Sequence, residues 1–150
     1  MAYTTDAQLD LEFGASNVTT WADIDNDGNA TTIANRKANA IADADAMIDA
    51  YLLDGPYEVP FTATIPIVIQ KASTLLAGYN LYMARGITDA DPAKNEMKWA
   101  EDKAMKIIHM ILGGKLRLNK DRSTKRISRP AAASDYDSDE NTITVFEERL

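Results

Sequence analysis

Three aspartates at alternate positions, followed by a glycine, form the segment of this sequence whose spacing most resembles a chemical site. Asp23, Asp25 and Asp27 stand at alternate positions of the stretch DIDNDGNAT, and Gly28 follows them. In an EF-hand loop, residues so spaced supply the first oxygen ligands to Ca²⁺, and the glycine permits the sharp turn. The spacing therefore predicts a loop with the carboxylate ligands of a divalent-cation site.

The rest of the loop fits this pattern only in part. Asn29 would offer its backbone carbonyl and Thr31 its side chain, but Ala34 stands where an EF-hand has a bidentate Glu. Three interpretations follow: a calcium-sensing loop, a weak calcium or magnesium site, or a metal-free corner in which Asp and Asn side chains bond nearby backbone N–H groups. We expect a corner rather than a switch, and no required cofactor.

No set of residues predicts catalysis. His109 is the only histidine, the chain has no cysteine, and neither a nucleophile motif nor a glycine-rich phosphate loop is present. A catalytic histidine needs an acid or nucleophile within hydrogen-bonding reach. We therefore expect a surface or interface histidine, and a protein that is not an enzyme. The lack of cysteine excludes disulfides and zinc–cysteine sites and fits a reducing compartment.

Charge is distributed in blocks along the chain. Residues 1–114 carry 8 Lys/Arg and 16 Asp/Glu, residues 115–129 carry seven basic residues and one acid, and residues 130–150 carry one Arg and six acids. The net charges are −8, +6 and −5, which describe an acidic body, a basic connector and an acidic tip. Such blocks usually mark interaction tails. The acidic body argues against nucleic-acid binding, because phosphates repel it.

The last part of the chain is predicted to be an extended arm that orders on a partner. Its basic residues have three interpretations: docking on an acidic surface, contact with DNA phosphates, or a solvated linker. The segment 142–146 alternates polar and apolar residues and is rich in β-branched ones, which predicts either a short strand added to a neighbour or a frayed end. The candidate partner-binding residues of the arm are Lys115, Arg117, Lys120, Arg122, Lys125, Arg126, Arg129, Ile143, Val145 and Phe146.

Hydrophobic periodicity predicts an all-α fold. The body spans residues 1–116 and contains four helices, and residues 117–150 form the arm. No apolar run approaches the length needed to cross a bilayer, and the opening segment MAYTTDAQLD lacks the basic and apolar regions of a signal peptide. The helices are expected at residues 6–13, 32–54, 66–85 and 92–112.

Local signals mark the ends of these helices. Thr5 and Gln8 form a capping box for the first helix, and Gly14 stops it. Asp91 suits the N-cap of the last helix, because a proline follows it. The helix at residues 66–85 is apolar on most sides, which predicts a central position or a contact with a neighbouring subunit. The acids that fall mostly off the apolar stripe of the second helix are Asp43, Asp45, Asp49 and Asp54.

A series of short motifs appears in a distinctive order. They are Met1-Ala2-Tyr3, Phe13-Gly14, the loop Asp23 to Gly28, Ile48-Asp49-Ala50-Tyr51-Leu52, Tyr57 to Phe61, Ile65-Pro66, Ala72, Tyr79, Leu81-Tyr82 and Ile111 to Leu118. Their order and spacing resemble the small head–tail connector proteins of tailed phages, in the family first catalogued from Mu-like prophages as a protein of unknown function. The resemblance covers roughly residues 1–118.

The resemblance implies an all-α adaptor whose copies form a ring, usually of twelve, beneath the portal protein. The ring would extend the DNA channel and dock a tail or stopper protein, while DNA passes without sequence-specific binding. The resemblance also implies that the protein does not contact a membrane. It would lie at the head–tail interface of the virion, and in the host cytoplasm during assembly. The alternative from another class is a small calcium-responsive binding module that uses the Asp-rich loop.

Overall fold

The computed structural model describes residues 1–62, 64–86 and 97–118. Within these ranges the chain forms five α-helices and no strand, which confirms the predicted all-α class. The strand predicted at residues 142–146 lies outside the described residues, as does the arm beyond Leu118. The helices are α1 (Asp6–Phe13), α2 (Ala15–Ala22), α3 (Ala30–Leu52), α4 (Ile67–Ala84) and α5 (Lys98–Leu112).

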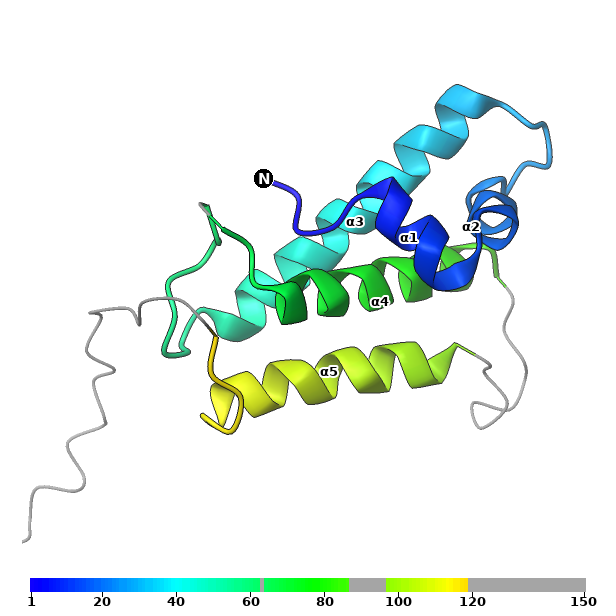
Figure 1. Cartoon of the computed structure of the whole chain (residues 1–150). Coiled ribbons are helices and arrows are strands. Elements are labelled where there is room, and N and C mark those ends of the chain that lie inside the picture. Colours follow the sequence, from blue (N-terminus) through cyan, green and yellow to red (C-terminus); the bar gives the residue numbers. More distant parts are fainter. Residues whose placement is uncertain (63, 87–96, 119–150) are drawn as a thin grey trace, which may run out of the picture.

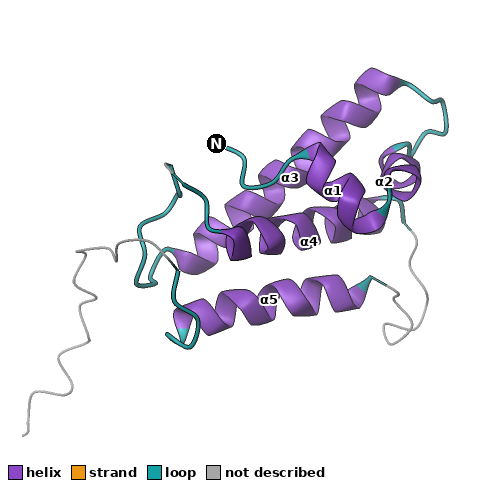
Figure 2. Ribbon diagram, viewed as in Figure 1, coloured by secondary structure: helices purple, strands orange, loops and turns teal. Residues whose placement is uncertain are grey.

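The helices pack in layers around α4. In Figure 1, α4 runs through the middle of the body, with α1 and α3 on one side and α5 on the other. The longest packed interfaces are those of α3 and α5 with α4, and Figure 2 shows loops joining the helices at the ends of the body. The predicted central position of this helix is confirmed, because its buried residues surround the helix: Ile69, Ala72, Ser73, Thr74, Leu75, Leu76, Ala77, Gly78, Leu81 and Tyr82.

The first two helices meet at Gly14. Thr5 and Gln8 exchange the two hydrogen bonds of a capping box at the start of α1, as predicted. Gly14 ends α1 with a φ of 86° and is also the N-cap of α2. The four predicted helices do not include α2, because a glycine followed by ASNVTT is typical of a helix stop and a polar loop. The spacing of Val18 and Ala22, which are both buried, was the available signal.

The long helix α3 begins where the Asp-rich loop ends. The Asn29 side chain accepts hydrogen bonds from the backbone N–H groups of Thr31 (3.1 Å) and Thr32 (3.2 Å), which makes it the N-cap. The helix therefore starts two residues before the predicted position. The predicted apolar stripe is confirmed at Ile41, Ala44, Ile48 and Leu52, but its fifth member, Tyr51, is 44% exposed. The helix also buries Lys37, Ala40 and Asp45.

The ends of α4 and α5 follow the proline and glycine signals where the structure describes them. Pro66 is the N-cap of α4, one position earlier than the first helical turn in which it was expected. After α4, Gly86 has a φ of 74°, a value that favours glycine. The predicted N-cap Asp91 lies outside the described residues. The α5 helix buries one stripe and ends at Gly113, and the buried residues are Ala100, Ala104, Ile108 and Ile111.

The described body extends to Leu118, beyond the end of α5. The Leu118 N–H donates a hydrogen bond of 2.8 Å to the Tyr57 hydroxyl, and both side chains are buried. Leu116 packs against the same core. The segment that leads into the arm is thus fixed to the loop between α3 and α4. Among the helices in the described ranges, none combines the length and hydropathy that a membrane span requires.

Candidate functional site

The Asp-rich loop is a corner held by its own side chains. The Asp23 carboxylate accepts hydrogen bonds from the N–H groups of Asp27 and Gly28, each at 3.2 Å. Asp27 in turn accepts one from the Asn29 N–H at 2.9 Å, and the Asn29 side chain caps α3. Gly28 has a φ of 64°, which explains a glycine at this turn. This is the pattern of linked Asx turns that the metal-free interpretation describes.

Two arginines fasten this corner to the helices around it. The Arg36 guanidinium, from α3, donates to the Asp25 carboxylate at 2.6 Å and to the backbone carbonyl that ends α2. Arg85, at the end of α4, donates to the Asp23 carbonyl at 3.3 Å and to the Asn26 side chain at 2.9 Å. The corner therefore joins α2, α3 and α4, and an arginine supplies positive charge to one of its carboxylates.

The predicted metal ligands thus already form hydrogen bonds or an ion pair within the protein. Asp23, Asp27 and Asn29 accept backbone hydrogen bonds, Asp25 pairs with Arg36, and Thr31 donates its N–H to the cap of α3. Among residues 1–62, 64–86 and 97–118, no three His, Cys, Asp or Glu side chains form a group that could hold a metal ion. Calcium or magnesium binding here stays a prediction.

A buried polar network, which the sequence analysis did not predict, lies between the first residues of the chain, α3 and α4. Asp45 accepts hydrogen bonds from the Tyr3 N–H (2.8 Å) and from the Ser73 hydroxyl (2.6 Å). The Tyr3 hydroxyl donates to Asp49 and accepts from the Phe61 N–H at 2.9 Å. The network anchors the residues before α1 in the core.

The expectation that the acids of α3 lie off its apolar face is wrong for Asp45. This residue is only 9% exposed, because it lies on the α3 face that also carries Ile41 and Ile48. Burial is the main cause that raises its pKa, although the hydrogen bonds from Ser73 and the Tyr3 N–H oppose the shift. The available signal was its position four residues after Ile41 and three before Ile48.

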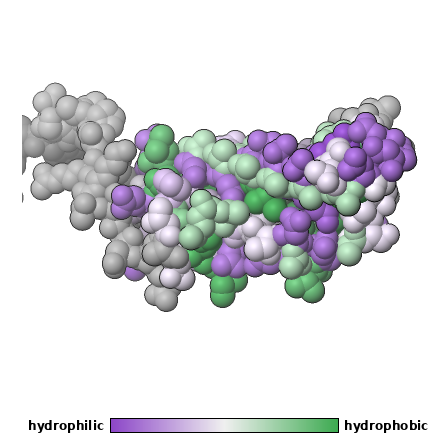
Figure 3. Space-filling model, turned by 90° about the horizontal axis from the view of Figure 1, so that it is seen from above, coloured by the Kyte–Doolittle hydropathy of each residue, from purple (hydrophilic) through white to green (hydrophobic). Residues whose placement is uncertain are grey.

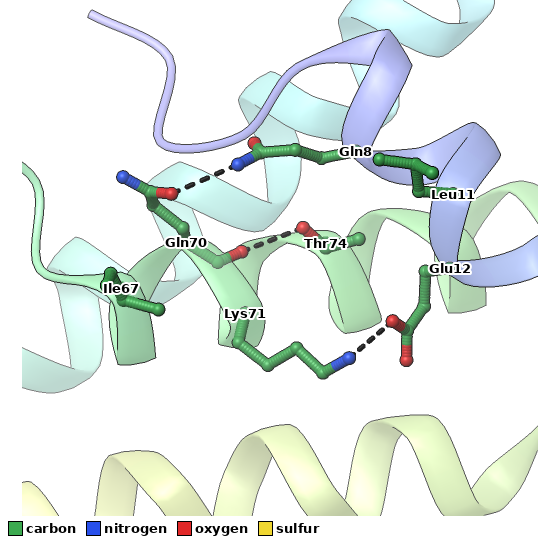
Figure 4. Close-up of a pocket in the computed structure, with 7 residues that line it drawn as sticks. All are labelled: Gln8, Leu11, Glu12, Ile67, Gln70, Lys71 and Thr74. Atoms are coloured by element: carbon green, nitrogen blue, oxygen red, sulfur yellow. Dashed lines mark hydrogen bonds and ion pairs between the residues drawn. The ribbon is translucent and has the colours of Figure 1, made fainter.

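A shallow groove of about 170 Å³ separates α1 from the start of α4 (Figure 4). Large apolar side chains stand at both of its sides: Leu11 is 87% exposed and Ile67 is 81% exposed. The Gln8 side chain donates to Gln70 at 3.0 Å across the groove. The groove is lined by Gln8, Leu11, Glu12, Ile67, Gln70, Lys71 and Thr74.

The surface of the body, seen from above, mixes hydrophobic and hydrophilic residues (Figure 3). Figure 3, which views the body from above, shows hydrophobic residues scattered between hydrophilic ones rather than gathered in one broad patch. Lys71 and Glu12 form an ion pair at the groove and neutralise each other there. The α1–α4 groove can therefore accept an apolar side chain from a partner, but it offers neither a charged ligand site nor catalytic groups.

A second groove, of about 540 Å³, runs along the outer side of α5. His109 lies in it, and its ring stands edge-on to Tyr51 at 6.5 Å between centroids. His109 is exposed, as the prediction of a surface histidine requires. The lining residues, which combine positive charges with two methionines, are Asp102, Met105, Lys106, His109, Met110, Gly113 and Lys115.

The structure describes only the first two of the candidate arm residues. Lys115 lines the α5 groove, and Arg117 is exposed on the segment that runs from α5 to Leu118. The remaining candidates lie outside the described residues: Lys120, Arg122, Lys125, Arg126, Arg129, Ile143, Val145 and Phe146. Their predicted contacts with partners stay predictions.

Comparison with known proteins identifies the family. Residues 3–134, most of the 150-residue chain, match the family model described as Bacteriophage Mu, Gp36. A comparison with curated proteins found no match. The matched region contains all five helices, the Asp-rich corner and the basic connector. The chain therefore belongs to the Bacteriophage Mu, Gp36 family, a family of phage structural or morphogenesis proteins.

Proposed function

We propose that this protein is a head–tail adaptor, or head completion protein, of a tailed phage or phage-like particle. Copies of the chain form a ring, with twelve as the expected number, beneath the portal protein. The ring extends the DNA channel and docks a tail or stopper protein. The location is then the head–tail interface of the virion, with the host cytoplasm as the site of assembly. This function needs neither catalysis nor a cofactor.

The observation that carries this proposal is the exposure of large apolar side chains on an otherwise polar body from a phage family. Leu11 and Ile67 lie on the two sides of the α1–α4 groove, and each is more than four-fifths exposed. Paired apolar side chains on the rim of a groove are typical of protein interfaces, where they become buried on assembly. Docking a partner there would remove their apolar surface from water, with a gain of about 25 cal/mol per Å².

Charge supports the role of the ring as a passage for DNA. Residues 1–114 carry a net charge of −8, and a wall of this sign repels phosphates instead of holding them. DNA would then slide through the ring without sequence-specific contact. The proposal requires an acidic channel surface, and a basic one would argue against it.

Assembly on the portal follows from multivalency. Each subunit makes a modest contact, and a closed ring of identical contacts raises the total affinity far above that of one copy. The isolated protein is therefore expected to be a monomer or a small oligomer at micromolar concentration. Sedimentation analysis measures this directly, and a stable twelve-membered ring of the purified protein would contradict assembly that depends on the portal.

The decisive experiment is quantitative mass spectrometry of purified particles, with this chain counted against the portal protein. A ratio near one to one is expected for a ring that matches the portal. A protein that is abundant in infected cells but absent from particles would overturn the adaptor role. The chain would then act in morphogenesis without remaining in the virion.

A further inference from the structure

We propose that the α5 groove binds the acidic C-terminal segment of the same chain, residues 135–148. This inference does not depend on the adaptor function, since it concerns the isolated protein. It rests on the charge of the groove, on the composition of the segment and on the place where the chain leaves the body.

The α5 side of the body has the opposite charge from the rest. Residues 98–118 carry five Lys/Arg and two Asp/Glu, a net charge of +3, whereas residues 1–97 carry five Lys/Arg and fourteen Asp/Glu, a net charge of −9. Figure 1 shows α5 on the far side of α4 from α1, so this positive charge lies on one outer face. An acidic ligand is therefore attracted to α5 and repelled by the remainder of the body.

Within the groove, the positive charges are available to a ligand. Lys98 pairs with Glu101 and, at 3.5 Å, with Asp102, so its single charge offsets one of the two acids of α5. Asp102 also lines the groove, where Lys106 and Lys115 outnumber it. Among the described residues, Lys106 and Lys115 have no ion-pair partner.

The methionines add an apolar component to the groove. Met105 and Met110 line it together with the lysines, and both are half-buried. Their flexible thioether side chains adapt to apolar ligands of irregular shape. The groove therefore fits an extended peptide that carries both carboxylates and apolar side chains.

The C-terminal segment has this composition. Residues 135–148 contain six acids and no basic residue, and three apolar side chains stand between the two acidic groups. The acids pair with Lys106 and Lys115, and the apolar side chains lie against the methionines. The residues concerned are Asp135, Asp137, Asp139, Glu140, Ile143, Val145, Phe146, Glu147 and Glu148.

The chain leaves the body beside the groove. Gly113 and Lys115 line it, and Leu118 is fixed to Tyr57 only three residues later. The connection from Leu118 to Asp135, residues 119–134, reaches as far as about 50 Å when extended, so it spans the distance to its own groove without strain. A short tether gives an effective concentration on the order of 1 mM, which favours binding within one chain over binding between copies.

The single histidine provides a direct readout, because His109 lies in the groove and gives one set of imidazole signals in an NMR spectrum. The comparison is between the full chain and a full-length variant in which the six acids of residues 135–148 are replaced by their amides. We expect the His109 signals to differ between the two proteins, and high salt to bring the full chain to the spectrum of the variant. Identical spectra at low salt would overturn the proposal.

Matched lysine variants locate the binding. A peptide of residues 135–148, added to the amide variant, is expected to restore the His109 signals. The double change Lys106→Gln and Lys115→Gln should weaken this binding by about fivefold, the effect of losing two exposed ion pairs. Lys103→Gln is the control, because Lys103 lies over the Trp99 ring and outside the groove. Equal weakening by the control would show attraction to α5 in general and would contradict a groove-specific site.

Carbodiimide cross-linking of the full chain shows whether residues 135–148 contact the α5 groove, the basic connector or a second molecule. Cross-links from Lys106 or Lys115 to residues 135–148, unchanged on dilution, support the proposal. Cross-links mainly to Lys120 and Lys125 would instead mean that the segment pairs with the basic connector. Cross-links between isotopically different copies in a mixed sample would mean that the segment docks on a second molecule. Either of these outcomes overturns binding within one chain.

Discussion

The aromatic ring of Phe13 occupies the space that a side chain at position 78 would need. A Cβ atom built on Gly78 lies 2.1 Å from Cε2 of Phe13, far inside van der Waals contact. Gly78 is in the middle of α4 and Phe13 is the last residue of α1, so the absence of a side chain lets α1 approach the central helix. The first helix is thereby positioned by a residue more than sixty positions away.

Gly78→Ala is therefore expected to destabilise the protein, although alanine is the better helix former. The helix propensity alone would favour alanine by about 1 kcal/mol, whereas overpacking of a fitted site costs about 1–3 kcal/mol. We expect the cost of overpacking to exceed the gain in helix propensity, so the free energy of unfolding should fall. Urea denaturation of the two proteins measures the difference.

A double-mutant cycle separates the clash from any other effect of the alanine. If the ring is the cause, Gly78→Ala should cost much less in a Phe13→Leu background, which removes the ring atoms. Additive effects of the two changes would show that Phe13 and Gly78 are not coupled, contrary to the geometry.

Because Asp45 is buried, the stability of the protein is expected to fall as the pH rises. Its pKa in the folded protein is raised above the ordinary value of 3.8, mainly because burial disfavours the charged form. The folded state then binds more protons than the unfolded state between these two pKa values, so stability falls as pH rises through that window. Relative to Asp45→Asn, the wild type should gain stability on acidification. A relative loss on acidification, measured by urea denaturation across a pH series, would mean a lowered pKa.

The hydroxyl of Tyr57 is expected to hold the segment that leads into the arm. Tyr57→Phe removes the acceptor of the Leu118 N–H and should cost about 0.5–1.5 kcal/mol. The more specific readout is hydrogen exchange, which should become faster at the Leu118 amide. Tyr51→Phe is the control, because Tyr51 is 44% exposed and its ring stands against His109. Unchanged exchange at Leu118 would mean that other contacts fix the segment.

The Asp-rich corner is expected to fold without a divalent cation. Its carboxylates already accept backbone N–H groups or the Arg36 guanidinium, and Ala34 replaces the bidentate ligand of an EF-hand. Calcium or magnesium at 1 mM should leave the melting temperature unchanged. A site with a Kd near 10 μM would instead stabilise the protein by about 2.7 kcal/mol at that concentration. Such stabilisation would favour the alternative function, a calcium-responsive binding module, over the adaptor.

Local signals in the sequence predict most of the helices, because each depends on a few adjacent residues. The capping box at Thr5, the glycine at position 14 and the apolar sides of α4 all have this character, and the structure confirms them. The short helix α2 was missed since its β-branched and polar residues have weak helix propensity. Its stability comes instead from burying Val18 and Ala22 against other helices, and a single pair of apolar residues four positions apart is too short a pattern to predict a helix.

The candidate site was harder to predict, because residues far apart in the chain form it. The spacing of Asp23, Asp25 and Asp27 is visible in the sequence, but the arginines that engage the corner come from α3 and from the end of α4. Likewise, Tyr3 and Asp45 are far apart in the chain and meet only once the fold has formed. Contacts of this kind depend on tertiary packing, so periodicity and spacing do not reveal them.

The central position of α4 decides where this protein can be shortened. Its buried residues surround the helix, so a variant that ends before α5 would leave a row of leucine and alanine side chains in water. Even a cut directly after α5 would remove Leu118 and leave the buried Tyr57 hydroxyl without this donor. The smallest independently folding unit should therefore run from Tyr3 to Leu118, and truncated versions made for crystallisation or for fusion to other proteins should keep both ends.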